Sequence, residues 1–175
     1  MVKQKGRNSA VISWSVASII IVASLIGSIV QARAETVKSR TSTYLAHFEA
    51  LPVGDVGGHI VATFSRKGLS FQENGEVATY ANWGTLDFIK GNGSFQGYSL
   101  VTFQDGSTYT VRWQGTVEGS LYRLAGEFIK GTKRFEGIKG TFSGTGKALT
   151  PYSKEKGTLS DAYFDITSTY TLPSK

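Results

Sequence analysis

The sequence predicts an all-β protein: one small antiparallel barrel of about eight strands in up-and-down order, preceded by an N-terminal signal helix. Three observations predict it. Short runs of β-branched and aromatic residues alternate with glycine-containing turns, glycines recur inside those runs, and one turn motif occurs twice. Nothing after the leader shows the helical period of about 3.6 residues, so we expect little or no helix there.

Residues 1–34 read as a signal peptide. A positively charged start precedes an apolar stretch over residues 10–30, and Ala32 and Ala34 are the small residues that signal peptidase requires before its cut. Cleavage would leave Glu35 as the first residue of an exported, periplasmic or extracellular domain. The alternative is an uncleaved anchor, because an apolar run of about 20 residues is long enough to span a bilayer.

Charge and cysteine content narrow the function classes. Four of the 19 lysines and arginines lie in the leader, which leaves 15 basic against 13 acidic residues, a net charge of +2. A charge this small gives no reason to expect a nucleic-acid partner. The absence of cysteine excludes disulfides, an N-terminal lipid anchor on cysteine, and thiolate chemistry.

We expect residues 35–57 to form an N-terminal arm or first edge strand and residues 58–175 to form the barrel. Tight turns are indicated at Asn74-Gly75 and Asn92-Gly93, with further reversals at Asp105-Gly106 and Glu118-Gly119. The clearest strand-like runs between turns are residues 60–64, 77–83, 98–103, 107–117 and 162–172.

An internal repeat supports this organisation. Residues 88–91 read Phe-Ile-Lys-Gly and are followed after three residues by Phe95-Gln96-Gly97; residues 128–131 and 135–137 repeat the pattern 40 positions later. The repeat predicts one hairpin used twice. Glycines inside strands mark bulges, bends or close backbone approach, as a tightly coiled barrel needs. They are Gly84, Gly97, Gly115, Gly126, Gly137, Gly140, Gly144 and Gly146.

Residues 131–146, which read GTKRFEGIKGTFSGTG, resemble the glycine-rich strand pair of the allene oxide cyclase-like and dirigent-like barrels of the calycin-type group. A looser likeness covers residues 58–172, and the closing residues 170–173 belong to it. The whole resembles small exported bacterial proteins of unassigned function. The resemblance implies an eight-stranded antiparallel barrel, and dimers or trimers occur in these families. No catalytic residue of the cyclases aligns here, so activity is left open.

Six aromatic residues are candidates for a pocket that binds an apolar ligand; the alternative is that they are ordinary barrel core. In residues 109–117 we expect Tyr109, Val111, Trp113 and Val117 to face inward. In residues 77–87 neither alternating face is clearly polar, so the inward face stays undecided there. The six candidates are Tyr80, Trp83, Tyr98, Tyr109, Trp113 and Tyr122.

Three charged residues are candidates for polar groups in the cavity: Asp87, Arg112 and Glu127. The two acids hold equivalent repeat positions on strands that could be neighbours, and paired carboxylates suit acid–base catalysis. The alternative places them on the solvated surface. His47 and His59 lack further ligands at metal-like spacing, so we predict no metal site, and no cofactor motif is present.

Three functions remain open at this stage. The favoured one is an exported barrel that binds a small apolar or aromatic ligand. The second is an isomerase or cyclase of the allene oxide cyclase type, or a dirigent-like auxiliary that orients a reactive intermediate. The third is a structural or interaction protein acting through its surface. A cavity in the barrel would favour ligand binding, and a buried ionisable group inside that cavity would favour catalysis. A solid core would favour a protein that acts through its surface.

Overall fold

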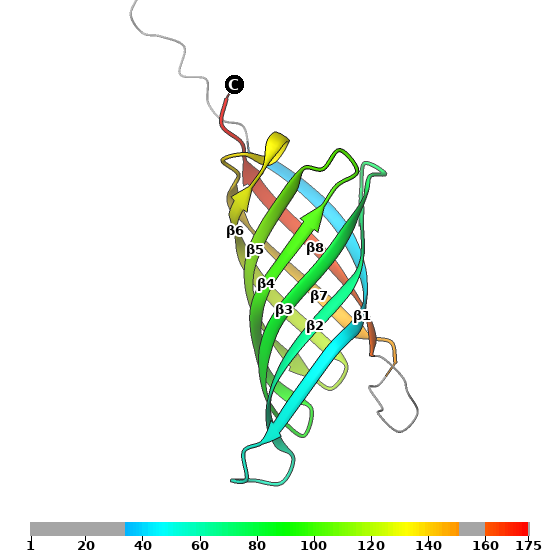
Figure 1. The fold of residues 1–175 in the computed structure, drawn as a ribbon, viewed down its shortest axis with the longest axis vertical. Coiled ribbons are helices and arrows are strands. Elements are labelled where there is room, and N and C mark those ends of the chain that lie inside the picture. The colour runs from blue at the N-terminus through cyan, green and yellow to red at the C-terminus, as the bar shows by residue number, and fades with distance from the viewer. Residues whose placement is uncertain (1–33, 151–159, 175) are drawn as a thin grey trace, which may run out of the picture. The chain divides into compact units, whose positions relative to one another are not determined.

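The computed structural model describes residues 34–150 and 160–174, and in this part the chain forms a closed antiparallel barrel (Figure 1). Every strand pairs with its sequence neighbours, and the last pairs with the first, which confirms the predicted all-β up-and-down barrel. No helix of the described residues could span a membrane. The strands are β1 (Glu35–Pro52), β2 (His59–Gln72), β3 (Val77–Ile89), β4 (Asn92–Thr102), β5 (Thr108–Glu118), β6 (Leu121–Gly131), β7 (Lys139–Ala148) and β8 (Asp161–Thr171), and a short 3-10 helix, η2, spans Lys133–Phe135.

The first strand is a full member of the wall. The predicted signal peptide lies outside the described residues up to residue 33, and β1 begins at Glu35, directly after the predicted cleavage site. β1 has 18 residues and pairs with both β2 and β8, with one register shift between Leu45 and His47. Residues 35–52 are therefore neither an arm nor an edge, because a closed barrel has no edge strand.

The turns use the residues that the sequence indicated, with one change. Gly75, Gly106 and Gly119 have positive φ angles, as tight reversals require. The β3–β4 turn lies two residues earlier than expected, at Lys90 and Gly91, whose φ angles are 51° and 81°. Positive φ at both central residues is the geometry that matches the twist of a two-residue hairpin.

The internal repeat does not form the same hairpin twice. Residues 88–97 form the expected β3–β4 hairpin, but the second copy continues from β6 into η2 before β7 begins. The cause is Phe135, which is buried with its ring 5.1 Å from Phe103 and 5.3 Å from Tyr109. The chain turns inward at η2 to place this ring, so one end of the barrel is closed.

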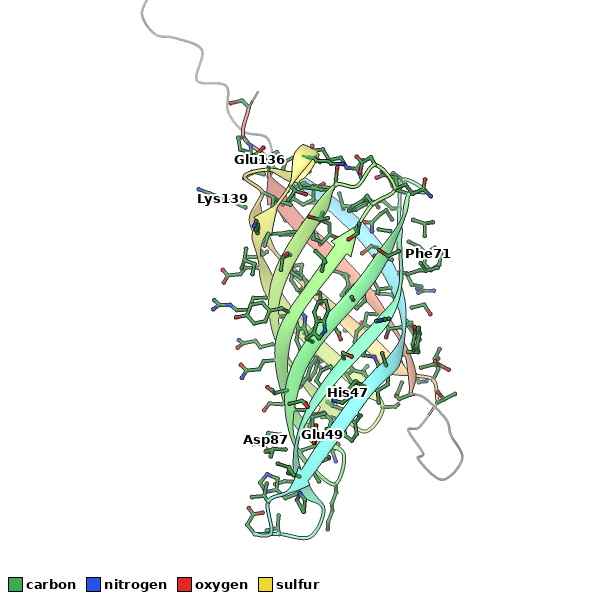
Figure 2. The ribbon with its side chains drawn as sticks, in the orientation of Figure 1. His47, Glu49, Phe71, Asp87, Glu136 and Lys139 are labelled. Carbon is green, nitrogen blue, oxygen red and sulfur yellow. The ribbon has the colours of Figure 1, made fainter. Side chains whose placement is uncertain are left out.

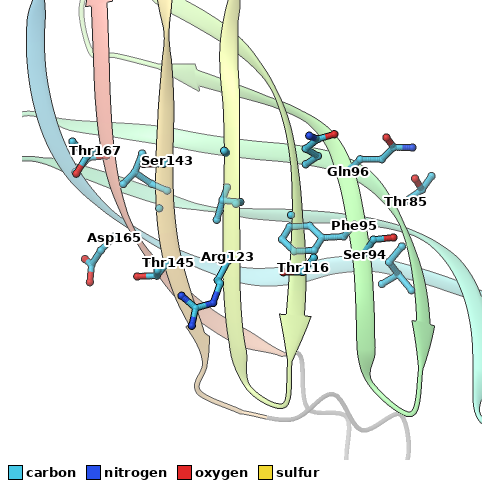
Figure 3. A pocket seen from close by; sticks show the side chains of 18 of the residues that line it. Thr85, Ser94, Phe95, Gln96, Thr116, Arg123, Ser143, Thr145, Asp165 and Thr167 are labelled. Atoms are coloured by element: carbon cyan, nitrogen blue, oxygen red, sulfur yellow. The ribbon is translucent and has the colours of Figure 1, made fainter.

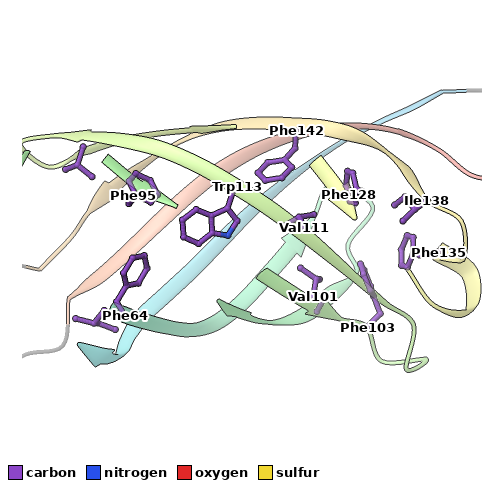
Figure 4. Close-up of a cluster of buried hydrophobic side chains, with 13 residues drawn as sticks. Phe64, Phe95, Val101, Phe103, Val111, Trp113, Phe128, Phe135, Ile138 and Phe142 are labelled. Atoms are coloured by element: carbon purple, nitrogen blue, oxygen red, sulfur yellow. The ribbon is translucent and has the colours of Figure 1, made fainter. Parts of the chain in front are cut away.

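Aromatic side chains run through the barrel from Phe95 and Trp113 to Phe103 and Phe135 at the closed end (Figure 4). Arg134 covers that end, with its guanidinium carbon 4.5 Å from the ring centre of Phe103. We call the packed rings of Phe103, Tyr109 and Phe135 at this end the aromatic plug. The β3–β4 and β5–β6 turns lie at the opposite end of the barrel (Figure 1).

Glycines in the wall make room for these rings. Gly84 pairs with Gly97 across β3 and β4, and the Trp113 indole lies against both. A Cβ atom on Gly84 would lie 2.7 Å from Trp113 Cη2, and one on Gly97 would lie 2.8 Å from the same atom. Gly126 gives the same room to Phe142. A Cβ atom at any of these three glycines would also clash with a backbone oxygen of the neighbouring strand. The predicted close approach is therefore confirmed at Gly84, Gly97 and Gly126, where the backbone and a ring inside the barrel together leave no room for a side chain.

Replacing Gly97 with alanine should therefore lower the free energy of unfolding by about 1–3 kcal/mol, the usual cost of overpacking a core. Urea unfolding measures this change, and near-ultraviolet circular dichroism reports the displaced indole. Gly57→Ala is the matched control, because a Cβ there meets nothing within 4 Å. Equal stability of the two variants would contradict the packing described.

Candidate functional site: the barrel lumen

The barrel encloses a cavity of about 510 Å³ lined by side chains from all eight strands. Its lining extends to Gly91, Gly119 and Leu149, which lie in the connections opposite the aromatic plug. Pockets for small molecules in proteins usually measure about 300–1,000 Å³. The lumen is therefore large enough for one small ligand, and one end of it is blocked.

The lumen has a polar side and an aromatic side. The buried apolar residues of β5 to β8 include Trp113, Phe128, Phe142 and Phe164. The buried polar side chains of the described strands all belong to β1–β4, and they are Thr41, Thr43, Arg66, Ser70, Asn82 and Ser99. An amphipathic cavity of this kind suits a ligand with an apolar body and a polar group.

Hydrogen bonds connect part of the polar side to Trp113 in one network. Trp113 Nε1 donates to Ser99 Oγ at 2.7 Å, and the Tyr80 hydroxyl lies 2.8 Å from the same oxygen. Asn82 Nδ2 donates to the Tyr80 hydroxyl oxygen at 3.1 Å. Burial raises the pKa of Tyr80, so its phenol stays protonated at neutral pH. The network therefore holds an aromatic ring, an amide and a phenol in place before any ligand binds.

Arg66 brings a charge into the lumen. Its side chain is only 6% exposed, and its backbone N–H donates to Asn82 Oδ1 at 2.8 Å. Nε donates to Thr43 Oγ1 at 2.9 Å, and Nη2 donates to the Ser160 carbonyl oxygen at 2.5 Å. Burial lowers the pKa of Arg66 because the charged form loses hydration, but a guanidinium remains charged at neutral pH. The lumen thus carries a fixed positive charge.

Four of the six predicted aromatics line this cavity: Tyr80, Tyr109, Trp113 and Tyr122. The inward face predicted for residues 109–117 is confirmed, since Val111, Trp113 and Val117 are buried and Tyr109 packs on the core.

Trp83 and Tyr98, the other two aromatic candidates, do not belong to the cavity. They lie opposite each other on β3 and β4 and are 53% and 50% exposed on the outer wall. On β3 the inward positions are held by Ala78, Tyr80 and Asn82, so residue 83 must point outward.

The three charged candidates also lie outside. Asp87, Arg112 and Glu127 are exposed, and Arg112 Nη2 donates to Glu127 Oε1 at 2.5 Å. β3 and β6 are separated by β4 and β5, so the two acids are not neighbours and form no acid–base pair. Of the two alternatives that the sequence left open, these groups take the solvated surface, because each occupies an outward position of its strand.

Sequence reasoning missed Arg66 although a signal was present. The predicted run stopped at residue 64, where Ile60, Ala62 and Phe64 already share one face. Extending that alternation by one step places Arg66 on the same inward face. The hydroxyl alternation at Thr41 and Thr43 in β1 was a second signal for a polar interior wall.

A second, larger hollow of about 1900 Å³ borders the outer wall (Figure 3). Its lining mixes inward residues such as Phe95 with exposed outward ones such as Thr116, Arg123 and Thr145. Thr116 pairs with Arg123, and Arg123 pairs with Thr145, so these polar side chains form a belt across neighbouring strands. The belt is open to solvent, unlike the lumen.

At the rim opposite the plug, His59 lies between two carboxylates. Nδ1 is 2.6 Å from Asp55 Oδ1, and Nε2 is 2.8 Å from Asp87 Oδ1. Asp87 marks this end of the barrel in Figure 2, and Glu136 and Lys139 mark the other. The second histidine, His47, is exposed. Within the described residues no three His, Cys, Asp or Glu side chains are grouped to hold a metal ion.

No family model matches the chain, and no curated protein matches it. Among solved structures, it is similar to the pterocarpan synthase dirigent protein, with a TM-score of 0.49 and 10% sequence identity. The similarity covers 81% of this chain and 93% of that protein. At this level the two chains share too little sequence and geometry to transfer an activity.

The His59 cluster predicts a pH-dependent stability. Hydrogen bonds, first to Asp87 and then to Asp55, raise the pKa of His59 above its ordinary 6.5. The charged imidazole therefore stabilises the fold fully below about pH 6.5, and this contribution is lost as the pH rises through the raised value. The pKa of Asp55 is lowered, chiefly by its hydrogen bond to His59. The contribution of Asp55 to the stability of the fold is therefore lost as the pH falls through its folded pKa.

The measurement is urea unfolding of wild type and His59→Gln from about pH 5 to about pH 9. The stability difference between them should shrink toward the alkaline end. His47→Gln, at an exposed site, serves as the control and should change stability little. A wild-type advantage that stays constant with pH would refute the assignment.

Proposed function

We propose that this protein binds one small, mostly apolar molecule inside its barrel. The observation that carries the proposal is the enclosed cavity of about 510 Å³ with an aromatic side and a hydrogen-bonded polar side. A packed core without such a space would have favoured a protein acting through its surface. Here the cavity is closed at one end by the Phe103 and Phe135 rings, so a ligand would enter from the opposite end.

Two physical effects support binding at this site. Removing apolar surface from water is worth about 25 cal/mol per Å², and rings such as Trp113, Phe95 and Tyr122 provide that surface. The network through Ser99, Tyr80 and Asn82 is already formed, so little side-chain entropy is lost when a ligand binds.

We further propose that the barrel acts outside the cytoplasm. The predicted cleavage site ends at Ala34, and β1 begins at Glu35. Removal of the leader at this point would leave every strand of the barrel whole. The leader sequence is the support for export.

A second candidate function is an isomerase or cyclase, or a dirigent-like auxiliary, that holds a reactive molecule in one conformation. A specific observation favours it: Arg66 is a buried ionisable group with ordered partners in the cavity. Catalysis of this kind depends mainly on positioning. Turnover of a bound compound would separate the two functions, since a binding protein releases its ligand unchanged.

Fluorescence titration with 1-anilinonaphthalene, a neutral apolar dye, tests the proposed cavity binding. Wild type should bind it saturably. Leu124→Trp should weaken binding about tenfold or more, because Leu124 lines the lumen and a larger side chain fills it. Ala125→Trp is the matched control, since the next residue of β6 points outward and is exposed. No saturable binding, or equal affinities of the two variants, would rule the site out.

A further inference from the structure

We infer that the ligand of the lumen is an organic acid: an apolar body with one carboxylate, which Arg66 binds. This inference rests on the proposed binding function and names the ligand class for the same site. Four features of the described residues carry it: unused donors on Arg66, its missing counter-charge, its fixed orientation and its aromatic surroundings.

Arg66 has hydrogen-bond donors that nothing uses. A guanidinium donates from Nε, Nη1 and Nη2 in a planar fork that matches a carboxylate. Nε and Nη2 each have one acceptor, Thr43 and the carbonyl of Ser160. No described residue accepts a hydrogen bond from Nη1. Arg66 also lines the cavity, so a ligand in the lumen can reach the free side of the fork.

Arg66 also lacks a counter-charge in the described part of the chain. The exposed arginines Arg40 and Arg112 and the half-buried Arg134 each form an ion pair with a carboxylate. Arg66 is buried and forms none, although burial is where an unpaired charge costs most. The Asp161 carboxylate attracts Arg66 electrostatically but forms no ion pair with it. This carboxylate accepts a hydrogen bond from Thr150 instead. An acidic ligand would supply the missing charge.

The orientation of the guanidinium is set before binding. Thr43 belongs to β1 and Ser160 precedes β8, so the two hydrogen bonds hold Arg66 across three neighbouring strands. A preorganised fork loses little entropy when it binds a planar anion.

The surroundings select an apolar body rather than a small inorganic ion. Phe64, on the same face of β2 as Arg66, has its ring centre 6.1 Å from that of Trp113. Phe95 lies 5.5 Å from Trp113 and 5.8 Å from Tyr122. A carboxylate at Arg66 would leave the rest of the ligand against these rings, which is the arrangement for an arylalkyl or similar acid.

Isothermal titration calorimetry at about pH 7 with a matched pair, 1-naphthylacetic acid and 1-naphthylacetamide, tests the inference. The two compounds have nearly the same shape and differ in charge. A hydrogen bond to a charged group is worth about 1.5–3 kcal/mol, so wild type should bind the acid about 10- to 100-fold more tightly than the amide. Arg66→Met should bring this ratio close to one, Arg66→Lys should retain part of it, and Arg112→Met, outside the barrel, should leave it unchanged.

The outcomes separate this inference from the proposed function. Equal binding of acid and amide by wild type overturns the carboxylate assignment and leaves the binding barrel standing. Failure of the acid to bind while 1-anilinonaphthalene binds overturns the assignment in the same way. If none of the three compounds binds, both proposals fall. If Arg66→Met does not fold, the acid-to-amide affinity ratios of wild type and of Arg66→Lys test the inference instead. A ratio near one in wild type already refutes the carboxylate assignment.

Discussion

The whole structure depends on one packing constraint: aromatic rings inside the barrel lie directly against glycines in its wall. Trp113 lies against Gly84 and Gly97, and Phe142 lies against Gly126. A barrel of eight strands leaves only a narrow interior, and rings of this size fit there when the facing wall has no side chain. At these positions the constraint therefore requires the glycine and fixes the position of the ring.

This packing also explains why a cavity and a solid plug coexist in one small barrel. At the closed end, Phe103, Tyr109 and Phe135 pack against one another and leave no room. Farther along, polar side chains from β1–β4 lie among the remaining rings, and they bond to one another instead of filling the centre. Arg66 is tolerated there because Thr43, Asn82 and the Ser160 carbonyl satisfy part of its hydrogen-bonding capacity.

The candidate residues that lie outside the lumen are each one step of strand alternation away from an inward position. Trp83 and Asn82 are adjacent in the chain, yet the first is on the outer wall and the second is in the lumen. The same holds for Arg112 and Trp113. Successive side chains of a strand point to opposite faces, and the alternation left the inward face of β3 undecided, so the sequence alone could not place Trp83 and Asp87.

Several properties follow from the sequence by itself. The all-β class, the barrel, the turns and the inward face of β5 depend on local signals, namely alternation and glycine turns, and these are short-range. The closing helix η2, the outward position of Trp83 and the Arg66 site needed the tertiary structure. Ser160 is 94 positions from Arg66 in the chain, and Ser99 reaches Trp113 only through the pairing of β4 with β5. Such contacts depend on the register and closure of the whole barrel, and no local pattern contains that information.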